Sequence, residues 1–434
     1  MKKHNKINVV TLGCSKNLVD SEHVLAQLHA AGFSVTYDSN DTDARIVIIN
    51  TCGFIGDAKE ESINTILEFV QAKEHGLIDQ LFVVGCLSER YADQLREEIP
   101  EVDQYFGVRD INEIVRFLTG SYREDLKTSR FLTTPNHYAY LKISEGCNWH
   151  CAYCAIPLIR GPHVSVPMEV LLDEARQLVS RGVRELIIVG QDTTYYGIDL
   201  YGSRKLAELL RQLAQIDGLH WIRLHYTYPA GFPEDVIEVM RSEPKICRYI
   251  DIPLQHIADS QLSAMKRGID RAATEQLMAD LRRQIPDIAI RTTLMVGFPG
   301  ESQEDFETLV EFVQHQKFDR LGVFAYSEEE GTPAANLQDN VPDEVKNARV
   351  DKIMNLQRQI SLEANNLKTG KTLEVVIDRI EGDYYIARSE FDSPEVDQEI
   401  LIKITPEYSF SPGDFCRVRV TACEEYDLYA SPLA

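Results

Sequence analysis

The first part of the chain alternates short apolar runs with amphipathic stretches. Three of these runs have the length and composition of buried strands: INVVTLGC (7–14), ARIVIINTCG (44–53) and QLFVVGC (80–86). Residues 20–32 and 57–75 show helical spacing of their apolar positions. Buried strands that alternate with helices predict a doubly wound parallel sheet. We therefore expect an α/β N-terminal domain over residues 1–120 and a polar, irregular linker over residues 121–136.

A second alternating series predicts a central domain over residues 137–342. Its six strand candidates are YAYLKI (138–143), ELIIVG (185–190), WIRLHY (221–226), YIDIPL (249–254), IAIRTTLMVG (288–297) and RLGVFAYS (320–327). The helix between the last two candidates opens with the capping pattern Ser302-x-x-Asp305. Six βα units are too few for the eight of a closed TIM barrel, so we expect an open, partial barrel.

The pattern changes again near the end of the chain. Residues 343–367 form a polar stretch with helical character, which we expect to be a connector. Residues 368–434 alternate apolar and polar positions and are broken by turn signals such as EGD and SPGD. That pattern is typical of a small antiparallel β-barrel.

Composition narrows the class of protein. The chain has 45 basic and 68 acidic side chains, a formal net charge of −23. Such a surface attracts basic partners and repels phosphate backbones, although acidity also serves solubility alone. The sequence has no apolar leader and no apolar run long enough to span a membrane, so we expect a cytoplasmic protein without membrane contact. Its nine cysteines then indicate thiols kept for metals or catalysis rather than disulfides.

Three cysteines are closely spaced in SEGCNWHCAYCAIP (144–157). Cys147, Cys151 and Cys154, here called the barrel trio, form a C-x₃-C-x₂-C pattern directly after the first predicted barrel strand. Active sites of parallel α/β barrels lie at the C-terminal ends of strands, so this is a position where catalytic residues are expected. Thiolates are soft ligands for iron–sulfur clusters and for zinc. If each thiol binds one iron of a 4Fe–4S cube, the fourth iron keeps an open position for a reactant.

Zinc is the structural alternative, because a closed zinc site needs a fourth ligand, which His150 or Cys247 would supply. The neighbouring sequence favours the cluster. C-x₃-C-x₂-C followed by a partial βα barrel resembles the radical S-adenosylmethionine (SAM) enzymes. The resemblance implies that SAM chelates the open iron and is cleaved by one electron to a 5′-deoxyadenosyl radical. It also implies that Tyr153 packs near the adenine.

Three further cysteines close the apolar runs TLGC, INTC and VVGC. Cys14, Cys52 and Cys86, here called the strand-end trio, each stand at the C-terminal end of a predicted parallel strand. Neighbouring strands lie about 4.8 Å apart, so these thiols can converge on one object of cluster size in the crevice where such sheets bind ligands. The alternative is that they are small buried apolar residues. The remaining thiols have no partner spacing and are expected to be structural: Cys247, Cys416 and Cys423.

At this point a narrower resemblance emerges. TLGCSKNLVDSE, INTCGFI, VVGCL, SEGCNWHCAYCAIP and the C-terminal β segment together resemble the methylthiotransferases over essentially the whole chain. These are radical SAM enzymes with two 4Fe–4S clusters and a C-terminal TRAM domain. The resemblance implies that the barrel trio binds the radical-generating cluster and the strand-end trio binds an auxiliary cluster that carries the donated sulfur. One SAM molecule would supply the methyl group and a second the radical, with an electron donor and a sulfur source as further partners.

Other candidate contacts for the cofactor lie near the ends of predicted barrel strands. Gln191 and Asp192 follow the second strand in IIVGQD and have groups suited to the ribose or the methionyl part of SAM. Arg223 in WIRLHY has the charge to hold a carboxylate of the cofactor or of a substrate. Gln255 in PLQH and Thr293 in RTTLMVG occupy similar places. Ordinary capping of strand ends explains each of these residues equally well.

Two substrate classes compete within this family. MiaB-like members modify an adenosine of transfer RNA, whereas RimO-like members modify the β-carbon of an aspartate in a small-subunit ribosomal protein. The stretch TLGCSKNLVDSE has Ser-Lys-Asn after its cysteine. This resembles the RimO-like branch, because MiaB-like proteins usually have Gln-Met-Asn there. We therefore expect a RimO-like methylthiotransferase, with the MiaB-like activity as the alternative.

The charge of the C-terminal segment supports the same choice. Residues 368–434 contain seven Lys or Arg and fourteen Asp or Glu, so their net charge is 7 − 14 = −7. Binding to RNA draws most of its affinity from basic side chains, so charge leaves RNA contact open but does not favour it. We expect a basic ribosomal protein as partner, alone or in the assembled small subunit. An alternative of another class is a non-catalytic scaffold that holds metal clusters and binds a basic partner.

Overall fold

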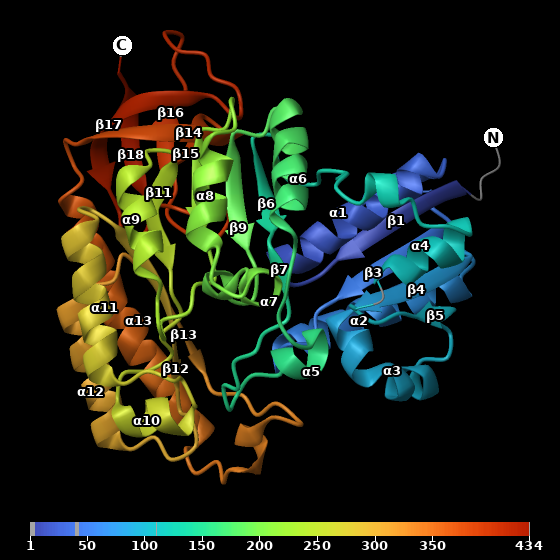
Figure 1. Cartoon of the computed structure of the whole chain (residues 1–434), viewed down its shortest axis with the longest axis horizontal. Coiled ribbons are helices and arrows are strands. Elements are labelled where there is room, and N and C mark those ends of the chain that lie inside the picture. Colours follow the sequence, from blue (N-terminus) through green and yellow to red (C-terminus); the bar gives the residue numbers. More distant parts are fainter. Residues whose placement is uncertain (1–4, 40–42, 110, 434) are drawn as a thin grey trace.

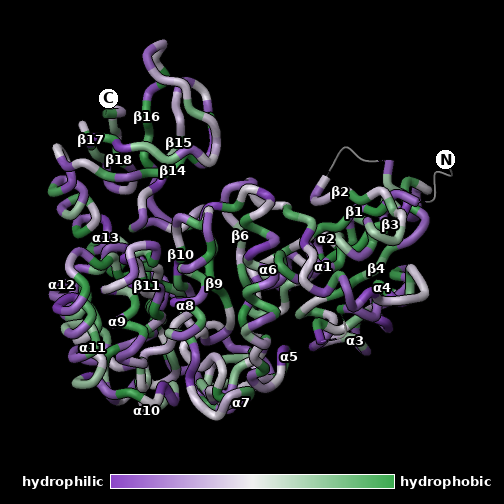
Figure 2. Tube along the Cα trace, turned by 45° about the horizontal axis from the view of Figure 1, so that its top comes forward, coloured by the Kyte–Doolittle hydropathy of each residue, from purple (hydrophilic) through white to green (hydrophobic). Residues whose placement is uncertain are grey.

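The computed structural model describes residues 5–39, 43–109 and 111–433. In chain order these residues form a five-stranded parallel sheet, a six-stranded parallel sheet and a closed five-stranded barrel (Figure 1). Hydrophobic residues follow the strands and the inner sides of the helices, as the green stretches of Figure 2 show. The three parts of the α/β fold class predicted from the sequence are all present.

The first sheet has the strand order β2-β1-β3-β4-β5, and all its pairs are parallel. Its strands are β1 (Lys6–Thr11), β2 (Ser34–Tyr37), β3 (Ile46–Thr51), β4 (Gln80–Gly85) and β5 (Gln104–Tyr105). Its helices are α1 (Ser15–Ala30), α2 (Gly56–Glu74), α3 (Cys86–Glu98) and α4 (Ile111–Thr119). Apolar side chains of α1 and α4 cover one face and those of α2 and α3 the other, so the sheet is doubly wound as predicted.

The second sheet has the order β13-β12-β11-β10-β9-β6 and is parallel throughout. Its strands are β6 (Tyr138–Lys142), β9 (Glu185–Val189), β10 (Trp221–Leu224), β11 (Ile246–Asp251), β12 (Ala289–Val296) and β13 (Arg320–Ala325). Five longer helices pack on its outside: α6 (Met168–Ser180), α8 (Leu206–Ala214), α9 (Glu234–Ser242), α11 (Arg271–Gln284) and α12 (Gln303–Gln316). The capping box predicted at Ser302 and Asp305 opens α12. The sheet does not close between β6 and β13, which confirms the partial barrel.

Short strands and helices lie at the end of this barrel where its long strands finish. They are β7 (Ser144–Glu145), α5 (Ile156–Arg160), β8 (Val164–Ser165), α7 (Ile198–Tyr201) and α10 (Asp259–Ala264). Single 3₁₀ turns lie at Glu124–Leu126, Thr193–Tyr195 and Pro333–Asn336. Helix α13 (Asp343–Asn366) then leads back along the barrel to the C-terminal strands.

The C-terminal barrel consists of β14 (Thr372–Glu381), β15 (Tyr384–Ser389), β16 (Ile400–Lys403), β17 (Phe415–Cys423) and β18 (Leu428–Pro432). The strands close in the order β14-β15-β16-β18-β17. One pair departs from the predicted antiparallel pattern, because β16 and β18 run parallel. Strand directions cannot alternate all the way around a ring of five, so one parallel pair is unavoidable.

The C-terminal barrel and the short helices after the strands lie at opposite ends of the central barrel (Figures 1 and 2). Buried ion pairs join the two barrels at the N-terminal ends of the central strands. Arg388 of β15 pairs with Glu185, the first residue of β9, and Arg320, the first residue of β13, pairs with Asp392. The opposite end, where α5 and α10 lie, therefore stays free of the C-terminal barrel. In the described part of the chain, every helix is too short or too polar to cross a membrane.

Candidate functional site

The strand-end trio lies at one edge of the first sheet. Cys14 is the N-cap of α1, Cys52 directly follows β3, and Cys86 is the first residue of α3. The preceding strands β1, β3 and β4 are neighbours in the sheet. The order β2-β1-β3 reverses the direction of winding between β1 and β3, and open α/β sheets bind ligands at such a switch point. The structure therefore brings these three thiols to the place where this topology builds sites.

Glycines allow the backbones beside these thiols to approach closely. Gly13 has φ +89°, and a Cβ there would lie 2.9 Å from the Sγ of Cys52. Gly85 has φ +105°, and a Cβ there would lie 2.5 Å from the carbonyl oxygen of Thr51. The Gly-Cys pairs in TLGC and VVGC are thus required by packing, because any side chain at either glycine would push the thiol-bearing loops apart.

The charges around the strand-end trio favour thiolates. Burial opposes ionisation of Cys14, but the charges of Lys16 and Arg160 and the nearby backbone amides outweigh it and lower the pKa of this thiol. Burial raises the pKa of Cys86 to about 12, against the opposing charge of Arg160. Negative charge on Cys14 raises the pKa values of both Cys52 and Cys86, so the three sulfurs are electrostatic neighbours. A metal cluster would supply the missing positive charge.

Asn17 and Arg160 are two further residues of this site, neither of which was among the predicted site residues. Asn17 donates hydrogen bonds to the carbonyl oxygens of Leu12 and Thr51, at 2.9 and 3.0 Å, and so braces the loops that hold Cys14 and Cys52. Its Oδ1 accepts from Arg160, the last residue of α5 in the barrel domain. The Ser-Lys-Asn stretch marked Asn17 in the sequence, but no local signal pointed to Arg160.

The barrel trio lies in the loop between β7 and α5. Backbone hydrogen bonds fix this loop: the amide of Cys147 donates to Gly161 at 3.0 Å, and the amide of Ala152 donates to Met265 at 2.9 Å. Burial, together with negative charge on Cys151, raises the pKa values of Cys147 and Cys154 to about 12. These three sulfurs are therefore also electrostatic neighbours in a buried setting.

A buried cation lies beside the barrel trio as well. Arg267 places Nη1 3.4 Å from the Sγ of Cys151 and 3.1 Å from the hydroxyl of Tyr153. Its guanidinium lies 4.3 Å from the ring centroid of Tyr228, which stacks on Trp149 at 4.1 Å. The sequence gave no sign of Arg267, because it follows α10, more than one hundred residues from the cysteines it contacts.

Both trios fit a cluster better than a single ion. Among the described residues, no group of three or more Cys, His, Asp or Glu is arranged to hold one metal ion. In a cube each sulfur binds a different iron, so the three thiols of a trio need not converge on one ion. Of the two fourth ligands proposed for a zinc site, Cys247 lies away from the barrel trio. His150 is exposed, and Cys247 is 1% exposed within an apolar cluster with Trp221 and Tyr249 that faces the C-terminal barrel.

The two trios are close to one another across the domain boundary. Cys86 packs in one buried cluster with Ala155 and Ile159, and Ala155 directly follows Cys154 of the barrel trio. Arg160 also lies in this bridge, where it binds Glu145 at 2.7 Å. Residues of α5 and of the loop before it therefore lie at the boundary between the two trios.

Four of the predicted cofactor contacts lie at the same end of the barrel as the trio. Gln191 donates to Glu145 at 2.8 Å, while its Oε1 is buried without a partner in the described structure. Asp192 accepts from the indole of Trp149 at 2.7 Å. Gln255 has φ +72°, and its amide donates to the carbonyl oxygen of Thr293 at 2.9 Å. Residues held in this strained backbone region are typical of ligand sites.

Arg223 requires a correction. Its guanidinium is fully buried and donates to Glu185 at 2.8 Å and to the carbonyl oxygen of Glu390 at 2.6 Å. It therefore does hold a carboxylate, but that carboxylate belongs to the protein. Its long side chain extends toward the N-terminal ends of the strands, where the C-terminal barrel docks, and so Arg223 joins two domains instead of contacting the cofactor.

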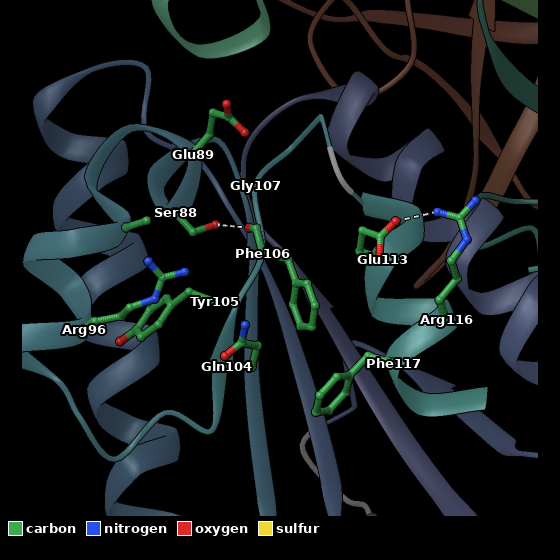
Figure 3. Close-up of a pocket in the computed structure, with 11 residues that line it drawn as sticks. Ser88, Glu89, Arg96, Gln104, Tyr105, Phe106, Gly107, Glu113, Arg116 and Phe117 are labelled. Atoms are coloured by element: carbon green, nitrogen blue, oxygen red, sulfur yellow. Dashed lines mark hydrogen bonds and ion pairs between the residues drawn. The ribbon is translucent and has the colours of Figure 1, made fainter. Parts of the chain in front are cut away.

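A separate open pocket of about 680 Å³ lies at the β5 edge of the first sheet (Figure 3). It is lined by residues of α3, β5 and α4, among them Arg96, Tyr105 and the 59% exposed Phe117. No cysteine lines it. The cysteines of both trios therefore lie outside this pocket. No feature of the sequence had indicated the pocket.

Comparison with known proteins agrees with this architecture. The sequence model of the radical SAM superfamily matches residues 141–313, that of the uncharacterized protein family UPF0004 matches residues 6–107, and that of the TRAM domain matches residues 369–433. Among solved structures, the radical SAM methyltransferase TsrM from Kitasatospora setae superimposes with a TM-score of 0.57 over 76% of this chain and 77% of that chain. Their 14% identity supports the shared fold alone.

Curated relatives match over the full length. Proteins named "Ribosomal protein uS12 methylthiotransferase RimO" from Phocaeicola vulgatus and Flavobacterium johnsoniae are each 55% identical, covering 99% of this chain and 100% and 98% of theirs. A protein of the same name from Cytophaga hutchinsonii is 49% identical over 98% of this chain and 97% of its own. The fold and the sulfur sites thus define an enzyme of the radical SAM class. Within that class, the chain belongs to the RimO family of methylthiotransferases.

Proposed function

We propose that this chain inserts a methylthio group at the β-carbon of an aspartate in ribosomal protein uS12, using two 4Fe–4S clusters and two molecules of SAM. The observation that carries the proposal is the pair of sulfur trios, each at the C-terminal edge of a parallel sheet, with residues of α5 at the boundary between them. The names of the relatives supply the ribosomal substrate. A ribosomal substrate implies that the protein acts in the cytoplasm.

The cysteines divide the chemistry between two sites. Cys147, Cys151 and Cys154 would hold the radical-generating cluster, and Cys14, Cys52 and Cys86 would hold the auxiliary one. The clusters supply one-electron reduction of SAM at the first site and a transferable sulfur at the second. Arg267 and Arg160 would stabilise the negative charge of the ligand sulfurs, because each is a buried cation beside its trio. A reductant and a sulfur donor complete the required partners.

The protein's own side chains would orient SAM at the barrel mouth. Tyr153 lies between two ligands and accepts from Arg267, which fixes its ring beside the trio. Gln191 has an unpartnered buried oxygen suited to a donor group of the cofactor. Asp192 acts indirectly, because its carboxylate holds Trp149 in place. Gln255 and Thr293 are the remaining proposed contacts.

Charge and geometry favour a protein substrate over transfer RNA. The segment 368–434 has a net charge of 7 − 14 = −7, which attracts a basic ribosomal protein and repels a phosphate backbone. Its barrel lies at the far end of the central strands from the sulfur trios (Figure 1). A substrate that touches both would span the length of the central barrel, so the C-terminal barrel would capture uS12 while a loop reaches the chemistry.

Mass measurement of the products tests the proposal. Reduced, cluster-loaded protein is incubated with SAM and a sulfur source, with either uS12 or unmodified transfer RNA. The expected result is a methylthio mass increment on uS12, and iron analysis of the protein should give about eight irons per chain. Modification of transfer RNA instead would favour the MiaB-like activity. Colourless zinc protein without either product would favour the scaffold.

Replacement of Arg267 is expected to shift the reduction potential of the barrel cluster. In Arg267→Gln, a buried positive charge 3.4 Å from a ligand sulfur is lost, so the reduced cluster is stabilised less and its potential becomes more negative. A redox titration monitored by electron paramagnetic resonance measures the change. Arg271→Gln is the control, because Arg271 is 43% exposed and pairs with Glu275. A potential equal to that of the unmodified protein would contradict the electrostatic role of Arg267.

A further inference from the structure

Lys16 is a buried cation that forms no ion pair with a carboxylate of the described residues. It is 7% exposed, and lysine is rarely so buried unless it is paired. Its ammonium lies over the ring of Tyr226, 3.1 Å from the ring centroid. A cation–π contact compensates only part of the cost of removing an ammonium from water.

The position of Lys16 in its helix is also unfavourable. Cys14 is the N-cap of α1, so Lys16 lies in the first turn, where the positive end of the helix dipole repels a cation. Acidic residues are preferred in such a turn, and this one contains none. Burial and the dipole of α1 therefore both destabilise the charged side chain of Lys16. A residue that lowers stability in this way is expected to have a functional role.

Helical spacing places Lys16 on the face of α1 that packs against the central barrel. Lys16, Val19 and Asp20 occupy positions i, i+3 and i+4, which form one face of a helix. Val19 packs with Tyr138, Tyr140, Ile187 and Val189 of the barrel. Asp20 pairs with Lys142 and Arg160. The whole face is therefore docked on the central barrel, where Lys16 lies over Tyr226, two residues beyond the end of β10.

The neighbours of the ammonium lie on both sides of the boundary between the first domain and the central barrel. On one side it lowers the pKa of Cys14, an auxiliary cluster ligand in the proposed function. On the other side it lies over Tyr226, which follows β10, and its charge contributes to the lowered pKa of the neighbouring His225, after burial and other charges. Tyr226 itself has φ +53°, a strained backbone for a bulky residue and typical of a functional position.

We propose that Lys16 binds the side-chain carboxylate of the substrate aspartate and so selects an acidic residue at the reaction site. This inference rests on the proposed function and adds to it the residue that recognises the target. A substrate carboxylate would pair with the Lys16 ammonium, which forms no ion pair with a carboxylate of the described residues. Its β-carbon would then lie between the barrel trio, where hydrogen is removed, and Cys14 of the strand-end trio, where sulfur is added. Lys16 is a binding and positioning residue, since proton transfer is not assigned to it.

A double-mutant cycle tests this contact. Lys16→Met keeps the approximate length of the side chain and removes its charge. The dissociation constant and kcat/KM of cluster-loaded enzyme are measured with uS12 and with uS12 in which the target aspartate is replaced by asparagine. Loss of one charge-assisted contact should weaken binding of unaltered uS12 on the order of tenfold to a hundredfold.

The pattern of losses decides the result. If Lys16 binds the target carboxylate, Lys16→Met and the asparagine substrate each weaken binding, and the two together weaken it no further. Lys16→Arg should recover part of the affinity, because the charge is kept. Lys6→Met is the matched control, because Lys6 lies on the surface of the same domain and pairs with Asp43; it should bind both substrates like the unmodified enzyme.

Three outcomes would overturn the inference. Additive losses would show that Lys16 and the carboxylate act independently. Loss of about four irons in Lys16→Met would show that Lys16 serves as a counter-ion of the auxiliary cluster. Equal affinity of Lys16→Met and unmodified enzyme for uS12 would remove the contact altogether. If the unmodified enzyme fails to modify uS12 at all, the proposed function fails first, and this result is distinct from all three.

Discussion

Cys151→Ala is expected to abolish reductive cleavage of SAM, with no 5′-deoxyadenosine detectable above background. Cys151 is 7% exposed and its Sγ accepts from Arg267 at 3.4 Å, so the sulfur is held in a fixed, buried position. A cube held by two thiols would lose its fixed orientation and its open iron. Anaerobic assay with a strong reductant, followed by chromatography of the nucleoside product, measures the effect. Retained cleavage would disprove the ligand assignment of the barrel trio.

Cys86→Ala is the matched variant in the strand-end trio. It should retain cleavage of SAM and lose insertion of sulfur into uS12, with iron content falling from about eight to about four per chain. Cys86 packs against Ala155, next to the barrel trio, so a parallel loss of cleavage would reveal structural damage instead. Cys423→Ala serves as the control, because this thiol lies in β17 of the C-terminal barrel and should affect neither step.

The placement of the strand-end cysteines at one edge of the first sheet was predictable, because strand ends are local features. An apolar run that ends in Gly-Cys marks both a strand end and a close approach of backbones, and parallel strands share one edge. The structure brings Cys14, Cys52 and Cys86 to that edge, where Gly13 and Gly85 are required by contacts of less than 3 Å. The six barrel strands were visible for the same reason, since each is a short buried run.

The charged groups around the sulfurs were not predictable from sequence patterns. Arg160, Arg267 and Lys16 each contact an element distant from their own in sequence, and nothing in their local spacing indicates that contact.

For Arg223 the sequence predicted a contact with the cofactor or substrate that the structure does not support. A long side chain in a four-residue strand can extend toward either end of the barrel, and its direction was set by Glu185 and the docking of the C-terminal barrel.

One residue, Arg160, makes several of the contacts that connect the two sulfur sites. Arg160 is almost fully buried, donates to Glu145 at 2.7 Å and to Asn17, and lies near Asp20 at 3.4 Å. Its charge opposes the burial that raises the pKa of Cys86. Arg160 therefore ties α1 to the barrel and stabilises the thiolates of the strand-end trio at once. Removal of one partner from such a buried network leaves the others without a counter-charge.

Arg160→Met is accordingly expected to destabilise the chain by about 3–5 kcal/mol and to lose the auxiliary cluster selectively. Iron should fall toward about four per chain, and sulfur insertion should stop while cleavage of SAM persists in the folded fraction. Denaturant titration, iron analysis and the nucleoside assay together measure these effects. Arg160→Lys keeps the charge but not the forked geometry, so it should retain more iron than Arg160→Met and still be less stable than the unmodified protein. Full iron content in Arg160→Met would contradict the electrostatic role, because the thiolates would then need no buried cation beside them.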